Sequence, residues 1–139
     1  MNNRSILWML VAVAGMTAFY LAALRSDPRV DALNQAIQAN GSAELKRYPY
    51  AFRVWRLEGS TAVMGTPRSP AMPVIRMIRA IDPSLSGKWP DHPDFVAAEK
   101  ALAKVQSEAR QIVLTQPGVS DVKWELDRDW LIERQIPLN

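Results

Sequence analysis

The chain has 139 residues and a formal net charge of +3, with no cysteine and a single histidine, His92. These counts exclude disulfide scaffolds, thiolate zinc sites, iron–sulfur clusters and cysteine nucleophiles, and they leave Ser–His catalysis only at His92. A chain of this length predicts one domain, and no internal repeat is visible in the sequence.

An uncharged apolar segment runs from Ile6 to Leu24 and predicts a transmembrane anchor. As a helix it reaches about 28 Å, which is close to the hydrocarbon thickness of a bilayer. Trp8 and Tyr20 lie near its two ends, where aromatic rings favour the boundary between membrane and water. The competing interpretation, a cleavable signal peptide, needs a shorter apolar core and a cleaner small-residue cleavage site. We therefore expect a retained anchor.

The charges beside this segment bear on its orientation. Arg4 precedes it, whereas Arg25 and Arg29 follow it and are partly offset by Asp27 and Asp31. Counting Lys and Arg by the positive-inside rule gives almost a tie. Because a short basic head commonly stays inside, we expect the C-terminal domain to face the periplasm, or the exterior of a plasma membrane.

Small residues repeat at four-residue spacing along the anchor, at Ala14, Ala18 and Ala22. Such a stripe lets a second helix approach closely, which would imply a partner helix or self-association. The alternative is that alanine is simply common in spanning helices.

The soluble part, residues 25–139, shows helical patterns in three places. The first helix has a start signal at Asp27-Pro28, where Asp can accept the first amide bonds and Pro suits the first turn. Asn40-Gly41 supplies its stop signal. The helices are predicted over residues 28–40, 73–81 and about 91–115.

Three strands are predicted between and after these helices. Tyr50–Glu58 is rich in aromatic and branched residues, and Gly59-Ser60 then gives a two-residue hairpin turn into Thr61–Thr66. Asp121–Asp127 alternates apolar and charged residues, so one of its faces is buried. Asp129–Ile132 is expected to form a final turn or a sheet-edge extension. The order α-β-β-α-α-β predicts an α+β domain with a three-stranded antiparallel sheet and helices on one face.

The net charge is the difference between two unlike halves. Residues 25–80 carry a formal charge of +5, residues 81–139 carry −3, and Arg4 adds the remainder. A polarised domain of this kind is a weaker binder of polyanions than the overall charge suggests, because the two fields partly cancel at a distance.

The basic half contains an interleaved aromatic and cationic segment, and its candidate binding residues are Tyr48, Tyr50, Arg53, Trp55 and Arg56. Aromatic rings with cations between them suit an anionic lipid head group or a glycan. The alternative is a strand whose rings enter the core. In that case Arg53 or Arg56 would oppose Glu125 or Asp127 across the sheet.

Two further tryptophans, Trp89 in a proline-bounded loop and Trp130 beyond the last strand, are candidates for anchors at a protein interface. Packing against the edge of the core is the alternative for both. His92 lies between Asp91 and Asp94, a set that could hold a divalent ion. The same acidic residues equally suit the start of a helix, and one imidazole is a minimal ligand set.

Carboxylates also recur near the end of the chain, and we expect them to form a solvated or salt-bridged face: Asp121, Glu125, Asp127, Asp129 and Glu133. Calcium sites usually gather their oxygen ligands in turning loops, whereas the wet face of a strand spaces carboxylates in a line. No phosphate-binding glycine loop, nucleophile elbow or His-Glu-x-x-His pattern occurs.

The pattern as a whole predicts a non-enzymatic, single-pass membrane protein, an accessory or assembly subunit of a bacterial-type envelope complex. We expect a protein partner or a second copy, with no nucleic acid, metal, cofactor or catalytic residue. The alternative is a membrane-tethered binding module for an anionic lipid head group or a glycan. A metal-dependent enzyme centred on His92 is a more distant alternative.

Overall fold

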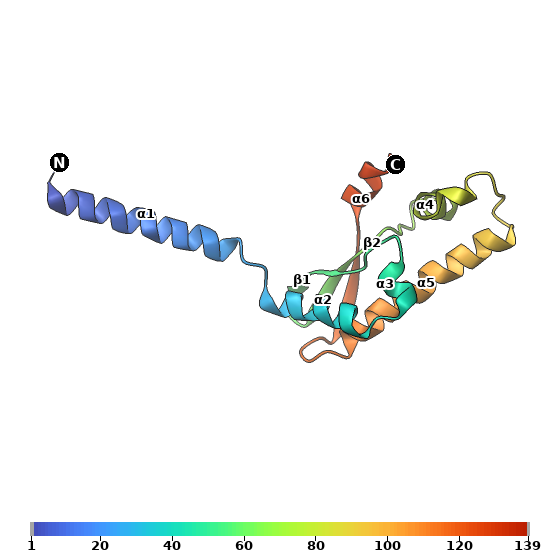
Figure 1. Cartoon of the computed structure of the whole chain (residues 1–139), viewed down its shortest axis with the longest axis horizontal. Coiled ribbons are helices and arrows are strands. Elements are labelled where there is room, and N and C mark those ends of the chain that lie inside the picture. Colours follow the sequence, from blue (N-terminus) through green and yellow to red (C-terminus); the bar gives the residue numbers. More distant parts are fainter. Residues whose placement is uncertain (1, 139) are drawn as a thin grey trace.

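The computed structural model describes residues 2–138, and it has an α+β fold in which one long helix leaves a small domain (Figure 1). The elements in chain order are α1 Asn3–Ala23, α2 Pro28–Asn40, α3 Ala43–Arg47, β1 Val54–Glu58, β2 Thr61–Thr66, α4 Val74–Ile81, the 3₁₀ turn η1 Pro83–Leu85, α5 Pro93–Leu114, β3 Asp121–Leu126 and α6 Arg128–Glu133.

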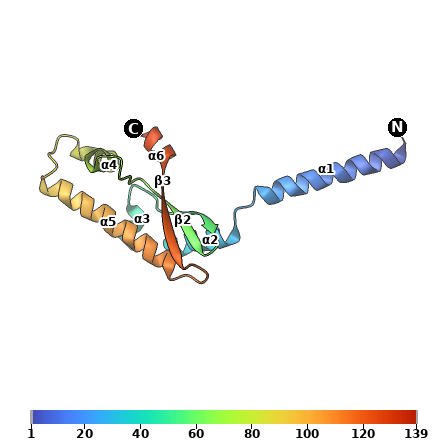
Figure 2. The same ribbon diagram turned by 180° about the vertical axis from the view of Figure 1, so that it is seen from behind.

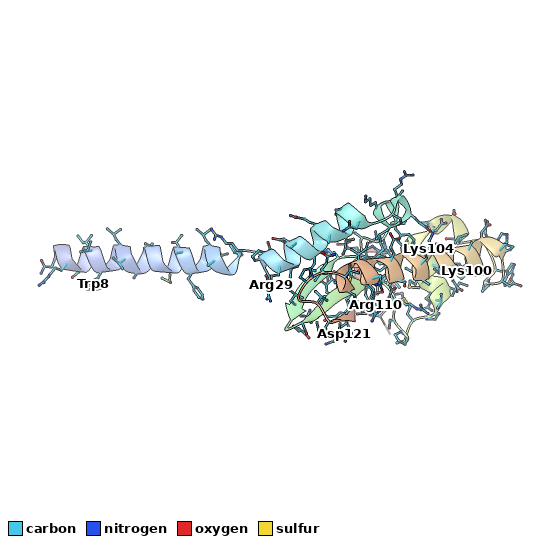
Figure 3. All side chains as sticks on the ribbon, turned by 90° about the horizontal axis from the view of Figure 1, so that it is seen from below. Trp8, Arg29, Lys100, Lys104, Arg110 and Asp121 are labelled. Atoms are coloured by element: carbon cyan, nitrogen blue, oxygen red, sulfur yellow. The ribbon has the colours of Figure 1, made fainter. Side chains whose placement is uncertain are left out.

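Helix α1 covers the predicted anchor and projects away from the domain in both ribbon views (Figures 1 and 2). Its segment Arg4–Ala22 has a mean hydropathy of 1.9 and is long and apolar enough to cross a membrane, and none of it is buried against the domain. Trp8, near the outer end of the helix, is 72% exposed (Figure 3). An apolar helix with no protein surface against it favours an apolar environment, which supports membrane association.

Helix α2 and the β-hairpin follow the predicted local signals. Asp27 Oδ1 accepts a hydrogen bond from the Arg29 amide at 2.9 Å, and Pro28 is the first helical residue. Gly59 has a φ of 62°, the left-handed conformation required of the first residue in this hairpin turn. The predicted bounds of the second strand, Thr61–Thr66, are confirmed.

The sheet is mixed, so the prediction of a purely antiparallel sheet is wrong. The strand order is β1-β2-β3; β1 and β2 are antiparallel, whereas β2 and β3 are parallel, with Thr61 opposite Asp121 and Thr66 opposite Leu126. The reason is the connection from β2 to β3, which contains α4 and α5. A helical crossover of this length returns the chain to the starting end of the neighbouring strand.

The first strand is shorter than predicted, because it begins at Val54 rather than at Tyr50. The side chain of Asn34, on α2, donates to the Val54 carbonyl at 2.9 Å and accepts from the Val54 amide at 2.7 Å. These are the backbone groups that a further strand would use, so α2 caps this edge of the sheet.

The hydrophobic core combines buried residues of the three strands with buried residues of helices α2 to α6. Alternation along the strands directs Val54, Ala62, Met64 and Val122 into this core, and each is buried. The buried side of α5, the predicted apolar seam, consists of Phe95, Leu102, Val105, Ala109 and Val113. We call the other side of the sheet the outer face.

Three local features differ from the sequence prediction. Helix α5 begins at Pro93 rather than near Asp91, because His92 caps it and its Nδ1 accepts from the Asp94 amide at 3.2 Å. The short helix α3, capped by Ser42, was not expected. The residues after the last strand form a helix, α6, rather than a turn or a strand extension.

Candidate functional site

An open groove of about 680 Å³ lies where the outer face of the sheet meets α6, and we call it the aromatic groove. It is lined by Arg53, Trp55, Glu125, Leu126, Asp127, Arg128, Asp129, Trp130 and Glu133. The groove therefore combines part of the aromatic and cationic segment with most of the acidic residues near the end of the chain. A wider depression of about 840 Å³ beside α2 contains only Arg53 of the predicted binding residues.

One wall of the groove depends on a glycine. Trp55 leaves β1 on the outer face and its ring lies over Gly65, which is buried in β2. A Cβ at Gly65 would stand 2.6 Å from Trp55 Cε2 and 2.7 Å from Tyr50 Oη, and closer still to Trp55 Cζ2. Only glycine permits this close approach of ring and backbone.

Another part of the groove depends on Tyr50 and Trp130, two aromatic residues that Asp127 links through hydrogen bonds. Tyr50 is 2% exposed, and its hydroxyl donates to Asp127 Oδ2 at 2.9 Å. Asp127 Oδ1 accepts from the Trp130 amide at 3.0 Å and so caps α6. The Tyr50 and Trp130 rings meet edge to face with centroids 5.4 Å apart, and the Arg134 guanidinium lies 3.9 Å from the Trp130 centroid. One carboxylate thus fixes the tyrosine, the helix start and the tryptophan.

Burial and the hydrogen bond to Asp127 raise the pKa of Tyr50 well above its ordinary value of about 10. The folded chain therefore holds this proton more tightly than the unfolded chain does. Its stabilising contribution is complete below pH about 10 and is lost as the pH rises from there toward the folded pKa. We expect the free energy of unfolding to fall above pH about 10, and Tyr50→Phe to make that fall shallower.

Urea unfolding of the natural chain and of Tyr50→Phe between pH 9 and about 11.5 measures this slope. Tyr48→Phe should make the fall shallower by nearly as much over this pH range, because burial raises the pKa of Tyr48 to about 12. An unchanged slope in Tyr50→Phe would show that this proton does not matter to stability.

An exposed ion-pair network borders the groove on the outer face. Arg56 Nη2 lies 2.7 Å from Glu125 Oε2 and 3.0 Å from Glu58 Oε1, so Arg56 pairs with Glu125 across the sheet, one of the pairings considered from the sequence. The hydrogen bond from Arg56 lowers the pKa of Glu125. Lys123 Nζ lies 3.9 Å from Glu58 Oε2.

The charge of the groove is mixed, with carboxylates in the majority. Arg53 and Arg128 face four carboxylates, those of Glu125, Asp127, Asp129 and Glu133. Asp127 is already used by Tyr50 and α6, Glu125 pairs with Arg56, and Glu133 Oε2 lies 3.8 Å from Arg134 Nη1. Among residues 2–138, Asp129 is the groove carboxylate that has no cation within 4.0 Å. Within residues 2–138, neither Arg53 nor Arg128 has a carboxylate within 4.0 Å.

The structure brings five of the seven candidate binding residues to this region. Arg53, Trp55 and Trp130 line the groove. Tyr50 and Arg56 each contact a lining carboxylate, because the Tyr50 hydroxyl donates to Asp127 and Arg56 pairs with Glu125.

The other two candidates lie elsewhere. Tyr48 stacks on Phe52, with ring centroids 6.2 Å apart. Trp89 is 78% exposed and belongs to the loop between η1 and α5. Figure 1 shows that this loop lies at the end of the domain far from α1. The stripe Ala14, Ala18 and Ala22 lies on the exposed helix α1.

Sequence reasoning missed Gly65, Asp127 and Arg134 as parts of the site. An isolated glycine within a strand is a recognisable sign of close backbone approach, so Gly65 carried a usable signal. Asp127 was placed with the solvated carboxylates, because its contact with Tyr50 spans 77 residues. No local pattern could have placed Arg134 over Trp130.

The residues around His92 act as a helix start. The His92 Nδ1 atom caps α5, and the Asp94 carboxylate pairs with Lys88. No group of three or more His, Asp or Glu side chains that could hold a metal ion is found in the described part of the chain. No protein family model, curated protein or solved structure matches this chain.

Proposed function

We propose that this protein is a non-enzymatic, single-pass membrane protein that acts as an accessory or assembly subunit of an envelope complex and binds a protein partner in the aromatic groove. The observation that carries this proposal is the convergence of Arg53, Trp55 and Trp130 in one open groove on a domain tethered by an exposed apolar helix. Tryptophan and arginine are the residues that most often dominate binding energy at protein interfaces.

The charge of the groove favours a protein segment over an anionic lipid head group or glycan. An anionic ligand gains from an excess of cations, whereas here four carboxylates line the groove beside two arginines. A protein segment can present both signs of charge and an apolar side chain between them. That pattern is complementary to two arginines, exposed carboxylates and two tryptophan rings.

The proposed membrane topology keeps the predicted orientation, with the C-terminal domain on the periplasmic side. The domain is joined to α1 by residues 24–27 only, so this short linker would keep the domain next to the membrane in which α1 lies. A C-terminal reporter that is active only outside the cytoplasm tests this orientation.

Purification of the tagged full chain in mild detergent tests the proposed function. We expect a stoichiometric protein partner that the variants Arg53→Glu and Glu133→Lys each reduce at least tenfold. Lys100→Glu, an exposed charge reversal on α5, should leave it unchanged and is the matched control (Figure 3). Loss of about 1.4 kcal/mol of binding free energy already gives a tenfold reduction.

Two results would contradict the proposal: a full chain that purifies alone, or a partner retained by both groove variants. Binding to vesicles containing anionic lipid, if it depended on Arg53 but not on Lys100, would instead support the membrane-tethered binding module.

A further inference from the structure

The two edges of the sheet differ in how they are covered. At the β1 edge, the Asn34 side chain on α2 takes both backbone hydrogen-bonding groups of Val54. Strand β3 forms the other edge, and within residues 2–138 no strand pairs with its far side (Figure 1). An uncovered edge strand is a template for pairing with another chain.

The backbone of β3 presents regular hydrogen-bonding groups at this edge. The Asp127 amide donates to the Thr66 carbonyl at 2.8 Å, so by alternation the odd-numbered residues of β3 face β2. The N–H and C=O groups of Val122, Trp124 and Leu126 therefore point away from the sheet. The Val122 amide is partly satisfied by the Asp121 carboxylate at 2.8 Å.

We propose that β3 pairs antiparallel with β3 of a second copy of this chain, with Trp124 opposite Trp124 at the two-fold axis. In this register Val122 lies opposite Leu126 on the core side of the sheet. On the outer face, Lys123 lies opposite Glu125, and this pair occurs twice because of the symmetry. The edge strand is thus complementary to itself in both polarity and charge.

Charge selects this register over its neighbour. Centring the pairing on Lys123 would place Lys123 opposite Lys123 and Asp121 opposite Glu125, so that each pair on the outer face carries like charges. Lys123 and Glu125 have the exposure that the pairing needs, with side chains 58% and 42% exposed.

The resulting dimer has one continuous six-stranded sheet. Its strands keep the cores of both domains on one side and the two outer faces, each with an aromatic groove, on the other. The pairing uses none of Arg53, Trp55 and Trp130, but Glu125 belongs both to the proposed strand pair and to the lining of the groove.

Charge reversal on the two sides of the pair tests the proposal. Full chains carrying two different affinity tags are co-expressed and purified in detergent, and recovery of one tag through the other measures dimerisation. Lys123→Glu gives Glu opposite Glu, and Glu125→Lys gives Lys opposite Lys. We expect each variant alone to lower cross-tag recovery at least tenfold.

The mixed pair distinguishes strand pairing from a folding defect. In a dimer of one Lys123→Glu chain with one Glu125→Lys chain, every Glu again lies opposite a Lys, so recovery should return to that of the natural chain. Lys100→Glu is the control and should change nothing. Two results would overturn the proposal: a dimer that persists in Lys123→Glu, or a mixed pair that does not form. A dimer that persists in Lys123→Glu would have its contact elsewhere, for example in α1.

A disulfide provides a second, geometric readout, because the natural chain has no cysteine. Residues 123 and 125 of the two chains would form a non-hydrogen-bonded antiparallel pair with Cα atoms about 4.5 Å apart, which a disulfide can bridge. Mild oxidation should therefore cross-link Lys123→Cys chains to Glu125→Cys chains. Cross-linking of Lys123→Cys chains only to one another would contradict the register.

Discussion

Replacing Gly65 by alanine is expected to lower the free energy of unfolding by about 1–3 kcal/mol, the usual cost of overpacking a filled site. At an unobstructed strand position the same change would be mildly stabilising, because alanine restricts the unfolded chain more than glycine does. Here the added methyl group would stand 2.6 Å from the Trp55 ring and 2.7 Å from the Tyr50 hydroxyl. This steric clash therefore makes the change in the free energy of unfolding destabilising.

Neither Tyr50 nor Trp55 can move away from Gly65 without disturbing the aromatic groove. The Tyr50 hydroxyl is held by Asp127, and the Trp55 ring forms a wall of the aromatic groove, so the displaced groups are those that shape the site. We expect Gly65→Ala to weaken partner binding as well as stability, with a change in tryptophan fluorescence as the Trp55 ring becomes more exposed.

Gly87→Ala is the matched control, because a Cβ at Gly87 would meet nothing within 4 Å. Urea unfolding of both variants gives the comparison, with a lower midpoint for Gly65→Ala and an equal or slightly higher midpoint than the natural chain for Gly87→Ala. Equal midpoints for the two variants would show that Trp55 does not pack on Gly65 as described.

The fold was predictable from the sequence wherever the signal was local. The Asp27-Pro28 start of α2, the glycine-first turn at Gly59 and the bounds of β2 all depend on a few adjacent residues. The direction of β3 relative to β2 depends on distant residues, since it is set by how the crossover through α4 and α5 returns to the sheet. A strand–helix–strand order was visible in the sequence, and it should have favoured a parallel pair.

The residues of the candidate site were recognisable by type but not by position. Interleaved rings and arginines singled out Tyr50, Arg53 and Trp55, and an exposed location was considered for Trp130. That these residues meet follows from the register of β2 and β3, which brings Asp127 to the end of the sheet beside Tyr50. No pattern within one segment contains that information.

Replacing Asp127 by alanine is expected to be the most damaging single change in the groove. The carboxylate caps α6 through the Trp130 amide, which contributes about 0.5–2 kcal/mol, and it accepts the hydroxyl of the buried Tyr50, which contributes about 1.5–3 kcal/mol for a hydrogen bond to a charged group. Because the two contacts share one side chain, we expect a loss of about 2–4 kcal/mol.

The damage should spread from stability to the site. Without its cap, α6 would fray, and Trp130 would lose its fixed edge-to-face contact with Tyr50. Asp127→Asn offers a finer comparison, since its single amide oxygen can still cap the helix, whereas its NH2 group replaces the oxygen that accepts the Tyr50 proton. Its loss of stability should lie between those of the natural chain and Asp127→Ala.

Asp129→Ala is the matched control for Asp127→Ala, because Asp129 lies in the first turn of the same helix but is exposed. Thermal unfolding of the three variants orders them by midpoint, and hydrogen exchange of the α6 amides reports fraying directly. If Asp127→Ala unfolded at the same temperature as Asp129→Ala, with α6 equally protected, then Asp127 would be one more solvated carboxylate. The groove would then lack the internal bond that fixes its Trp130 wall.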